Sequence, residues 1–151
     1  MSRNLETVKQ IYAAFGRGDI PAILDTLADD VAWEAWADNS AAKAGVPWLV
    51  PRHGKTGAAD FFGLVGPTLV VRDFRVLSLM DGGDRVAAEF EIECDVPSTG
   101  GHYRDEEMHL WSFDAAGKVI RLRHYTDTAK HIRAAGLRES REDAARVVGS
   151  S

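Results

Sequence analysis

The sequence lacks the features that mark several classes of protein. It has one cysteine, Cys94, so an internal disulfide cannot form and a zinc site built from cysteines is excluded. No apolar run approaches the roughly 18 residues that a membrane-spanning helix needs. The first residues lead into a patterned helix rather than the apolar stretch of a signal peptide. We therefore expect a cytoplasmic protein with no membrane partner.

A surplus of positive charge is also missing. The 18 Lys and Arg residues are outnumbered by 23 Asp and Glu residues, which gives a formal net charge of −5. Nucleic-acid backbones are bound by clustered Lys and Arg, whereas the arginines after residue 138 alternate with acids, as on a solvated surface. Nucleic acid is therefore not an expected partner.

What the chain does contain suits a single globular domain. Its 151 residues are 45% hydrophobic and 27% charged, which is ordinary for a soluble domain with a core of its own. We expect this domain to occupy residues 1–136 and a polar tail to follow over residues 137–151.

Helical periodicity dominates the start of the chain. Apolar residues recur at three- and four-residue steps from Leu5 to Phe15, which predicts an amphipathic helix over 3–16. Asp19 followed by Pro21 is typical of a helix start, because Asp caps free amides and Pro fits the first turn. A second, short helix is therefore expected.

The stretch after the second helix mixes several signals. We expect this helix to end at residues 29–30, and residues 31–36 to form a short strand. Residues 37–53 contain Trp48 and form either a loop that covers a binding site or a short helix folded onto the core. A third helix is expected from Thr56.

From residue 68 onward the pattern is that of strands. The sequence predicts four, over about 68–80, 86–96, 102–113 and 118–126, and then a short helix over 128–135. The second of these strands alternates strictly, with buried apolar side chains, Cys94 among them, on one face. Its other face is acidic and is expected to be the outer surface of the sheet, facing either solvent or arginines across the sheet, for which Arg121 and Arg123 are the candidates. The acidic residues are Glu89, Glu91, Glu93 and Asp95.

The order of these elements predicts the fold class. Helices that precede a run of antiparallel strands are typical of an α+β domain, in which the helices pack on one face of a curved sheet.

Two sets of motifs resemble a known family. The run Gly18-Asp19-Ile20-Pro21-Ala22-Ile23-Leu24, followed by Leu27-Ala28-Asp29-Asp30-Val31-Ala32-Trp33-Glu34, resembles the entry of a nuclear transport factor 2-like (cystatin-like) domain. Phe113-Asp114, Gly117-Lys118-Val119-Ile120-Arg121 and Tyr125-Thr126-Asp127 resemble its last hairpin. The resemblance covers about residues 2–135 and is greatest to the SnoaL-like and ketosteroid isomerase-related branch.

This resemblance implies a cone-shaped sheet wrapped around helices, with an apolar pocket at its wide end. It also implies a homodimer joined through the outer face of the sheet. The ligand would be a small hydrophobic or carbonyl-containing molecule, and no cofactor is expected, because hydrogen bonds can stabilise an enolate. The expected pocket residues are Tyr12, Trp33, Glu107, Trp111, Leu122 and His124.

Two members of the superfamily are poor matches at their catalytic positions. The base and the two enolate-binding donors of the ketosteroid isomerase would fall on Ala35, Ile11 and His109, and none of these matches. The epoxide hydrolase needs an arginine and an aspartate on the third strand, where this chain has Phe90 and Ile92.

A SnoaL-like cyclase is the remaining catalytic hypothesis. In it Asp127, at the end of the last strand, removes a proton from the carbon beside a carbonyl, and His109 orients the carbonyl oxygen. Asp127 has the opposite parity to Leu122 and His124, so the alternative is that it caps the helix beginning at Thr128.

A metal site and a non-catalytic function are two further hypotheses. A metal site made of His109, His124 and Glu107 is not expected, because these residues have no metal-site spacing signature. A non-catalytic ligand-binding or dimerisation module of the same fold is the competing function.

Overall fold

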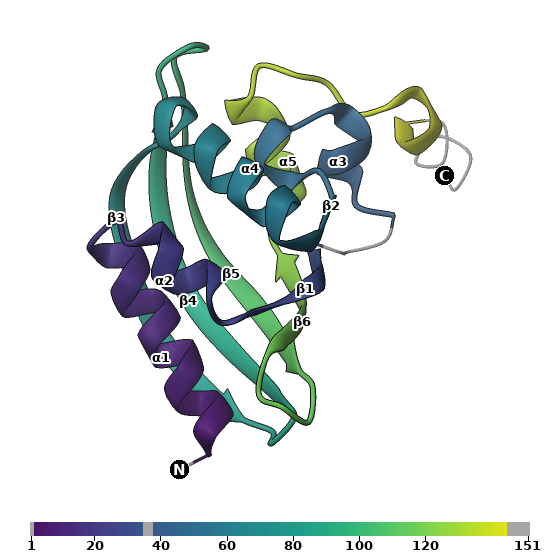
Figure 1. The fold of residues 1–151 in the computed structure, drawn as a ribbon. Helices are drawn as coiled ribbons and strands as arrows, with labels where there is room; N and C mark the ends of the chain where they lie inside the picture. Colours follow the sequence, from purple (N-terminus) through teal and green to yellow (C-terminus); the bar gives the residue numbers. More distant parts are fainter. Residues whose placement is uncertain (1, 35–37, 145–151) are drawn as a thin grey trace.

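A six-stranded sheet curls around the N-terminal helices in the computed structural model, which describes residues 2–34 and 38–144 (Figure 1). The strands run in the order β2-β1-β6-β5-β4-β3, with β1 and β6 parallel and all other neighbours antiparallel. Along the chain the elements are α1 (Arg3–Gly16), α2 (Ile20–Leu24), β1 (Leu27–Trp33), α3 (Ser40–Ala44), η1 (Pro47–Leu49), β2 (Arg52–His53), α4 (Gly54–Thr68), β3 (Val70–Asp81), β4 (Arg85–Val96), β5 (Gly101–Phe113), β6 (Val119–Tyr125) and α5 (Thr128–Ala134). The predicted α+β fold class is confirmed.

The first two helices each begin at a side chain that caps them, whereas α2 ends at Leu24, earlier than the predicted residues 29–30. The Ser2 hydroxyl accepts a hydrogen bond from the amide of Leu5 at the start of α1, and the Asp19 carboxylate accepts one from the amide of Ala22 at the start of α2. Both side chains satisfy an amide that has no partner within its own helix.

Strand β1 begins earlier than predicted, at Leu27. Asp29 and Asp30 lie within it and do not end the preceding helix. The side chains of these two neighbouring residues are both exposed. The pairing of β1 with β6 shifts register between Leu27 and Ala32, and this shift interrupts the alternation of buried and exposed side chains. Residues 35 and 36 of the predicted strand, including the isomerase base position at Ala35, lie outside the described residues.

Residues 38–53 follow the second of their two predicted alternatives. They form α3, η1 and β2, and Trp48 and Leu49 are buried. With Tyr103 and Ile132 they belong to a second apolar cluster beside the main core. This segment therefore closes one end of the domain.

The alternation predicted for β4 is confirmed, and Cys94 is buried. The partners of its acidic face differ from the prediction. Glu91 pairs with Arg75 on β3 at 3.1 Å and with Arg104 on β5. The reason is the strand order: β4 lies between β3 and β5, while β6 is one strand further away.

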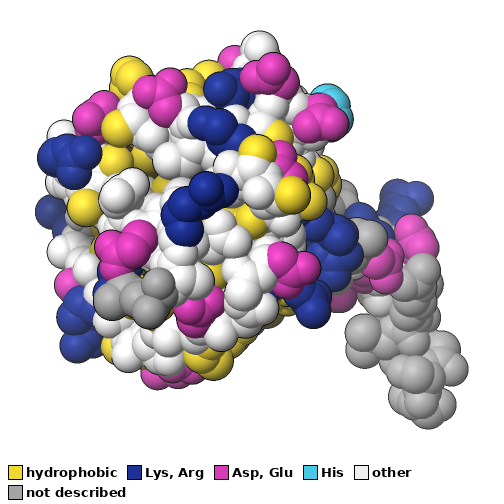
Figure 2. All heavy atoms as spheres, turned by 60° about the horizontal axis from the view of Figure 1, so that its bottom comes forward, with side chains coloured by type: hydrophobic (Ala, Val, Ile, Leu, Met, Phe, Trp, Pro, Cys, Tyr) yellow, Lys and Arg dark blue, Asp and Glu magenta, His cyan; other side chains and the backbone are white. Residues whose placement is uncertain are grey.

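Charges of both signs are mixed on the surface. On the face shown in Figure 2, Lys and Arg side chains lie among Asp and Glu side chains, so no patch of one sign forms there.

Beyond α5, residues 141–144 are helical, and the Asp143 carboxylate lies 2.9 Å from the Lys43 ammonium on α3. None of the helices in the described ranges is long and apolar enough to cross a membrane.

Candidate functional site

A cavity of about 90 Å³ lies between the helices and the concave face of the sheet. Its walls are mainly aromatic and aliphatic side chains from α1, α4, η1 and the strands. Seven residues singled out from the sequence line it: Tyr12, Trp33, Glu107, His109, Trp111, Leu122 and His124. The remaining predicted site residue, Asp127, does not line it.

His124, on β6, is the centre of the polar side of this cavity. Its Nδ1 lies 3.0 Å from a carboxylate oxygen of Glu34, and its Nε2 lies 2.6 Å from a carboxylate oxygen of Glu107. Ionised carboxylates only accept hydrogen bonds, so both ring nitrogens carry protons and the imidazole is positively charged. Burial opposes this charge, but the two carboxylates outweigh it and raise the pKa of His124 well above its ordinary value.

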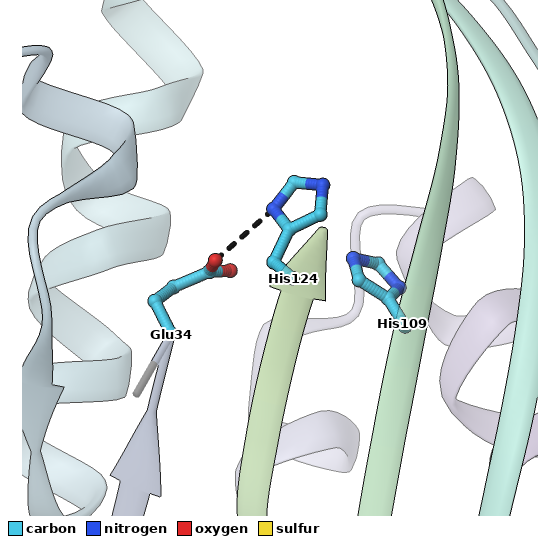
Figure 3. Close-up of side chains that lie close together, drawn as sticks. All are labelled: Glu34, His109 and His124. Atoms are coloured by element: carbon cyan, nitrogen blue, oxygen red, sulfur yellow. Dashed lines mark hydrogen bonds and ion pairs between the residues drawn. The ribbon is translucent and has the colours of Figure 1, made fainter. Parts of the chain in front are cut away.

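Glu34 reaches the cavity through an unusual backbone conformation. It follows the last residue of β1, is 3% exposed, and has a φ of +60°. A side chain other than glycine rarely adopts this left-handed region, at a cost on the order of 1 kcal/mol or more. The turn departs from the strand geometry of β1, and Glu34 and Trp33 both line the cavity. Figure 3 shows Glu34 directed at His124.

His109, on β5, is the neighbour of His124, and their ring centroids are 4.5 Å apart. Its Nδ1 lies 2.7 Å from the Tyr12 hydroxyl, which also accepts a hydrogen bond from the Trp111 indole at 3.0 Å. Burial, together with the charge on His124, lowers the pKa of His109 well below its ordinary value. His109 is therefore neutral, and its Nε2 has no hydrogen-bond partner among the described residues.

A second buried group lies behind Glu107. His131, on α5, places its Nε2 2.6 Å from Glu107 and 3.2 Å from Asp105. The Trp48 indole donates to Nδ1 of the same ring at 2.8 Å. Although the two carboxylates favour a charged ring, the indole N–H occupies the nitrogen that a second proton would need, so His131 is neutral with its proton on Nε2.

Asp127 does not take either of its predicted roles. Its side chain is exposed and forms no capping hydrogen bond with α5. Its backbone amide instead donates to an Asp105 carboxylate oxygen at 3.0 Å. Asp127 lies beyond the end of β6 and is not among the residues that line the cavity, so we do not assign it the base.

Four members of the site were missed in the sequence. Glu34 is the last residue of the first family motif, but its side chain reaches the cavity through a positive φ, which the residue type does not predict. Asp105 has the same parity as Glu107 on the predicted strand over 102–113, and this was the signal that could have found it. His131 and Trp48 come from segments far apart in the chain, and the packing of α5 against η1 brings them together.

The comparisons with known proteins agree with this geometry. The family model for the SnoaL-like domain matches residues 8–122. The chain belongs to the SnoaL-like domain family. No protein with a curated function matches the sequence significantly.

Solved structures place this SnoaL-like domain in the nuclear transport factor 2-like superfamily. One such protein from Burkholderia pseudomallei is 26% identical, with a TM-score of 0.71 over 89% of this chain and 98% of that one. Another from Burkholderia thailandensis is 24% identical, with a TM-score of 0.75 over 89% and 98%. TerC, co-crystallised with polyporic acid, is 25% identical, with a TM-score of 0.70 over 89% and 99%.

Proposed function

We propose that this SnoaL-like domain binds a compact, largely apolar carbonyl compound and moves a proton at the carbon beside its carbonyl group. One observation carries the proposal: the buried carboxylate of Glu34 lies with His109 and His124 in the wall of an otherwise apolar cavity. Apolar cavities with a few convergent polar groups are typical of small-molecule sites. The complex of TerC with polyporic acid supports ligand binding by this fold.

Glu34 is the base in this proposal. Its carboxylate takes a proton from the carbon beside the carbonyl, and the electron pair of the broken C–H bond moves toward the carbonyl oxygen to form an enolate. Return of the proton to another carbon yields an isomer, and return to the same carbon yields proton exchange. His124 holds the carboxylate through its 3.0 Å hydrogen bond and places a positive charge beside the enolate.

His109 supplies the hydrogen bond to the enolate oxygen. Because Trp111 donates to the Tyr12 hydroxyl, that hydroxyl can donate to Nδ1 of His109, which leaves the ring proton on Nε2. A donor fixed in this way before the reaction stabilises negative charge as it develops. The buried indole N–H of Trp33, which has no partner among the described residues, offers a second donor.

The positions of these residues support the same chemical class. Tyr12 and Glu34 are each one residue away from Ile11 and Ala35, where alignment with the ketosteroid isomerase expects a tyrosine and a base. The cavity therefore contains a carboxylate from the residue that follows the first strand and a tyrosine from the first helix, although a strict count along the sequence does not find them.

Proton exchange of cyclohexanone in D₂O, followed by NMR, tests the proposal. We expect the protein to accelerate exchange at the carbons beside the carbonyl, Glu34→Gln to abolish the acceleration, and Asp127→Asn to retain it. Binding of 4-nitrophenol, a compact mimic of an enolate, checks that Glu34→Gln keeps an intact cavity. Binding of 4-nitrophenol without any exchange would favour the non-catalytic module.

The homodimer stays a prediction. Large apolar side chains are exposed along the edge strand β3, among them Leu77 and Met80, each 45% exposed. We propose that a second copy covers part of this surface. Light scattering on the purified protein tests this, since a monomeric mass would contradict it.

A further inference from the structure

The three polar side chains in the cavity also have the geometry of a metal-ion site. Glu34, His109 and His124 each offer one donor atom, and these atoms all lie within 4.8 Å of one another. A cation held at about 2.1 Å from each donor, the usual bond length to imidazole and carboxylate, needs donors no more than about 4.2 Å apart, so binding would draw the three side chains slightly closer together. The residues come from β5, from β6 and from the residue that follows β1, as Figure 3 shows.

The outer hydrogen bonds of both imidazoles match those of metal ligands. Metal-bound histidines almost always pass their second ring N–H to a carboxylate or another acceptor. His124 has Glu107 at 2.6 Å from Nε2, and His109 has the Tyr12 hydroxyl at 2.7 Å from Nδ1. With a cation bound, His124 gives up the Nδ1 proton that it otherwise donates to Glu34. The ring proton of His109 then lies on Nδ1, with the Tyr12 hydroxyl as its acceptor, so that Nδ1 of His124 and Nε2 of His109 both face the cation.

The buried charge in this region also favours a cation. Three carboxylates, those of Glu34, Asp105 and Glu107, are each at most 4% exposed. Glu34 and Glu107 both contact His124, so a divalent cation at Nδ1 of His124 would replace the proton there and keep positive charge beside both carboxylates. A buried carboxylate without a compensating charge is costly, and the cation would offset that cost.

We infer that Glu34, His109 and His124 form a site for a divalent transition-metal ion such as Zn²⁺. Two imidazoles and one carboxylate are suited to zinc or iron(II), and three protein ligands leave coordination positions open toward the cavity. This goes beyond the proposed function. A bound cation occupies the base and the enolate donor, so it competes with the carbonyl compound.

Titration of the metal-free full-length protein with Co²⁺ tests the inference, because Co²⁺ in a four- or five-coordinate site absorbs visible light much more strongly than hydrated Co²⁺ does. We expect one equivalent to bind with this absorption and Zn²⁺ to displace it. Glu34→Gln should remove stoichiometric binding. Glu107→Gln, which changes only an outer partner, should weaken binding by about 10- to 100-fold.

His102→Asn is the matched control. His102 is half exposed and lies against Glu93 and Asp95, so it is the group expected to bind metal adventitiously at the surface. We expect this variant to keep the site in the cavity. Loss of the Co²⁺ spectrum in His102→Asn, or no change in Glu34→Gln or Glu107→Gln, would overturn the inference.

The outcomes also separate this inference from the proposed function. If 4-nitrophenol binds and cyclohexanone exchanges while Co²⁺ does not bind, the metal site is wrong and the proposed function stands. If Co²⁺ binds and displaces 4-nitrophenol while no exchange occurs, the metal site stands and the proposed proton transfer is wrong.

Discussion

The Tyr12 hydroxyl joins two buried groups, so Tyr12→Phe is a sensitive perturbation of the site. The substitution keeps the ring and removes the 3.0 Å bond from Trp111 and the 2.7 Å bond with His109. A buried hydrogen bond contributes about 1 kcal/mol net, so we expect a loss of about 2 kcal/mol in the free energy of unfolding. With a denaturant slope of about 2 kcal/mol per molar urea, the midpoint falls by about 1 M.

The same substitution tests how His109 is oriented. Without the hydroxyl, no group fixes the proton on Nε2, and we expect affinity for 4-nitrophenol to fall about tenfold, equivalent to about 1.4 kcal/mol. Tyr125→Phe is the control, because its hydroxyl is only half buried and lies 3.3 Å from an Arg123 nitrogen. An unchanged midpoint and an unchanged affinity in Tyr12→Phe would refute the role given to this hydroxyl.

Four further expectations concern packing and reactivity. Leu122→Ala, at a side chain 1% exposed, should lower the unfolding free energy by about 3 kcal/mol in a urea titration. Gly101→Ala should also destabilise the fold, by about 2 kcal/mol or more, because a Cβ there would lie 2.0 Å from the Ala134 carbonyl oxygen. In contrast, Gly63→Ala, which meets no atom within 4 Å, should stabilise α4 by about 0.5 kcal/mol. Burial raises the pKa of the Cys94 thiol to about 11, so a thiol reagent at neutral pH should label it only after unfolding; rapid labelling of the native protein would contradict its placement in the core.

Periodicity and capping predicted most of the fold, because they act locally. The helix over 3–16, the cap at Asp19 and the alternation of β4 depend on neighbours within a few residues. The bounds of β1 were wrong because a register shift puts Asp29 and Asp30 on the exposed side in succession, and that shift depends on its pairing with a distant strand, β6.

The candidate site was partly predictable for the same reason. Parity places Glu107, His109 and Trp111 on one face of β5, and His124 lies directly opposite His109 on β6. The alternation of side chains along a strand does not predict the position of Glu34, because its positive φ interrupts that alternation at the end of β1. Parity also left the role of Asp127 open, and the structure places its side chain on the exposed surface beyond the end of β6.

The central claim is that Glu34 removes a proton from a carbonyl compound in this cavity. The most direct measurement compares the rate of cyclohexanone proton exchange in D₂O for the unaltered protein, Glu34→Gln and Asp127→Asn. We expect the acceleration of exchange to be lost in Glu34→Gln and to be unchanged in Asp127→Asn. Exchange that survives in Glu34→Gln and disappears in Asp127→Asn would contradict it.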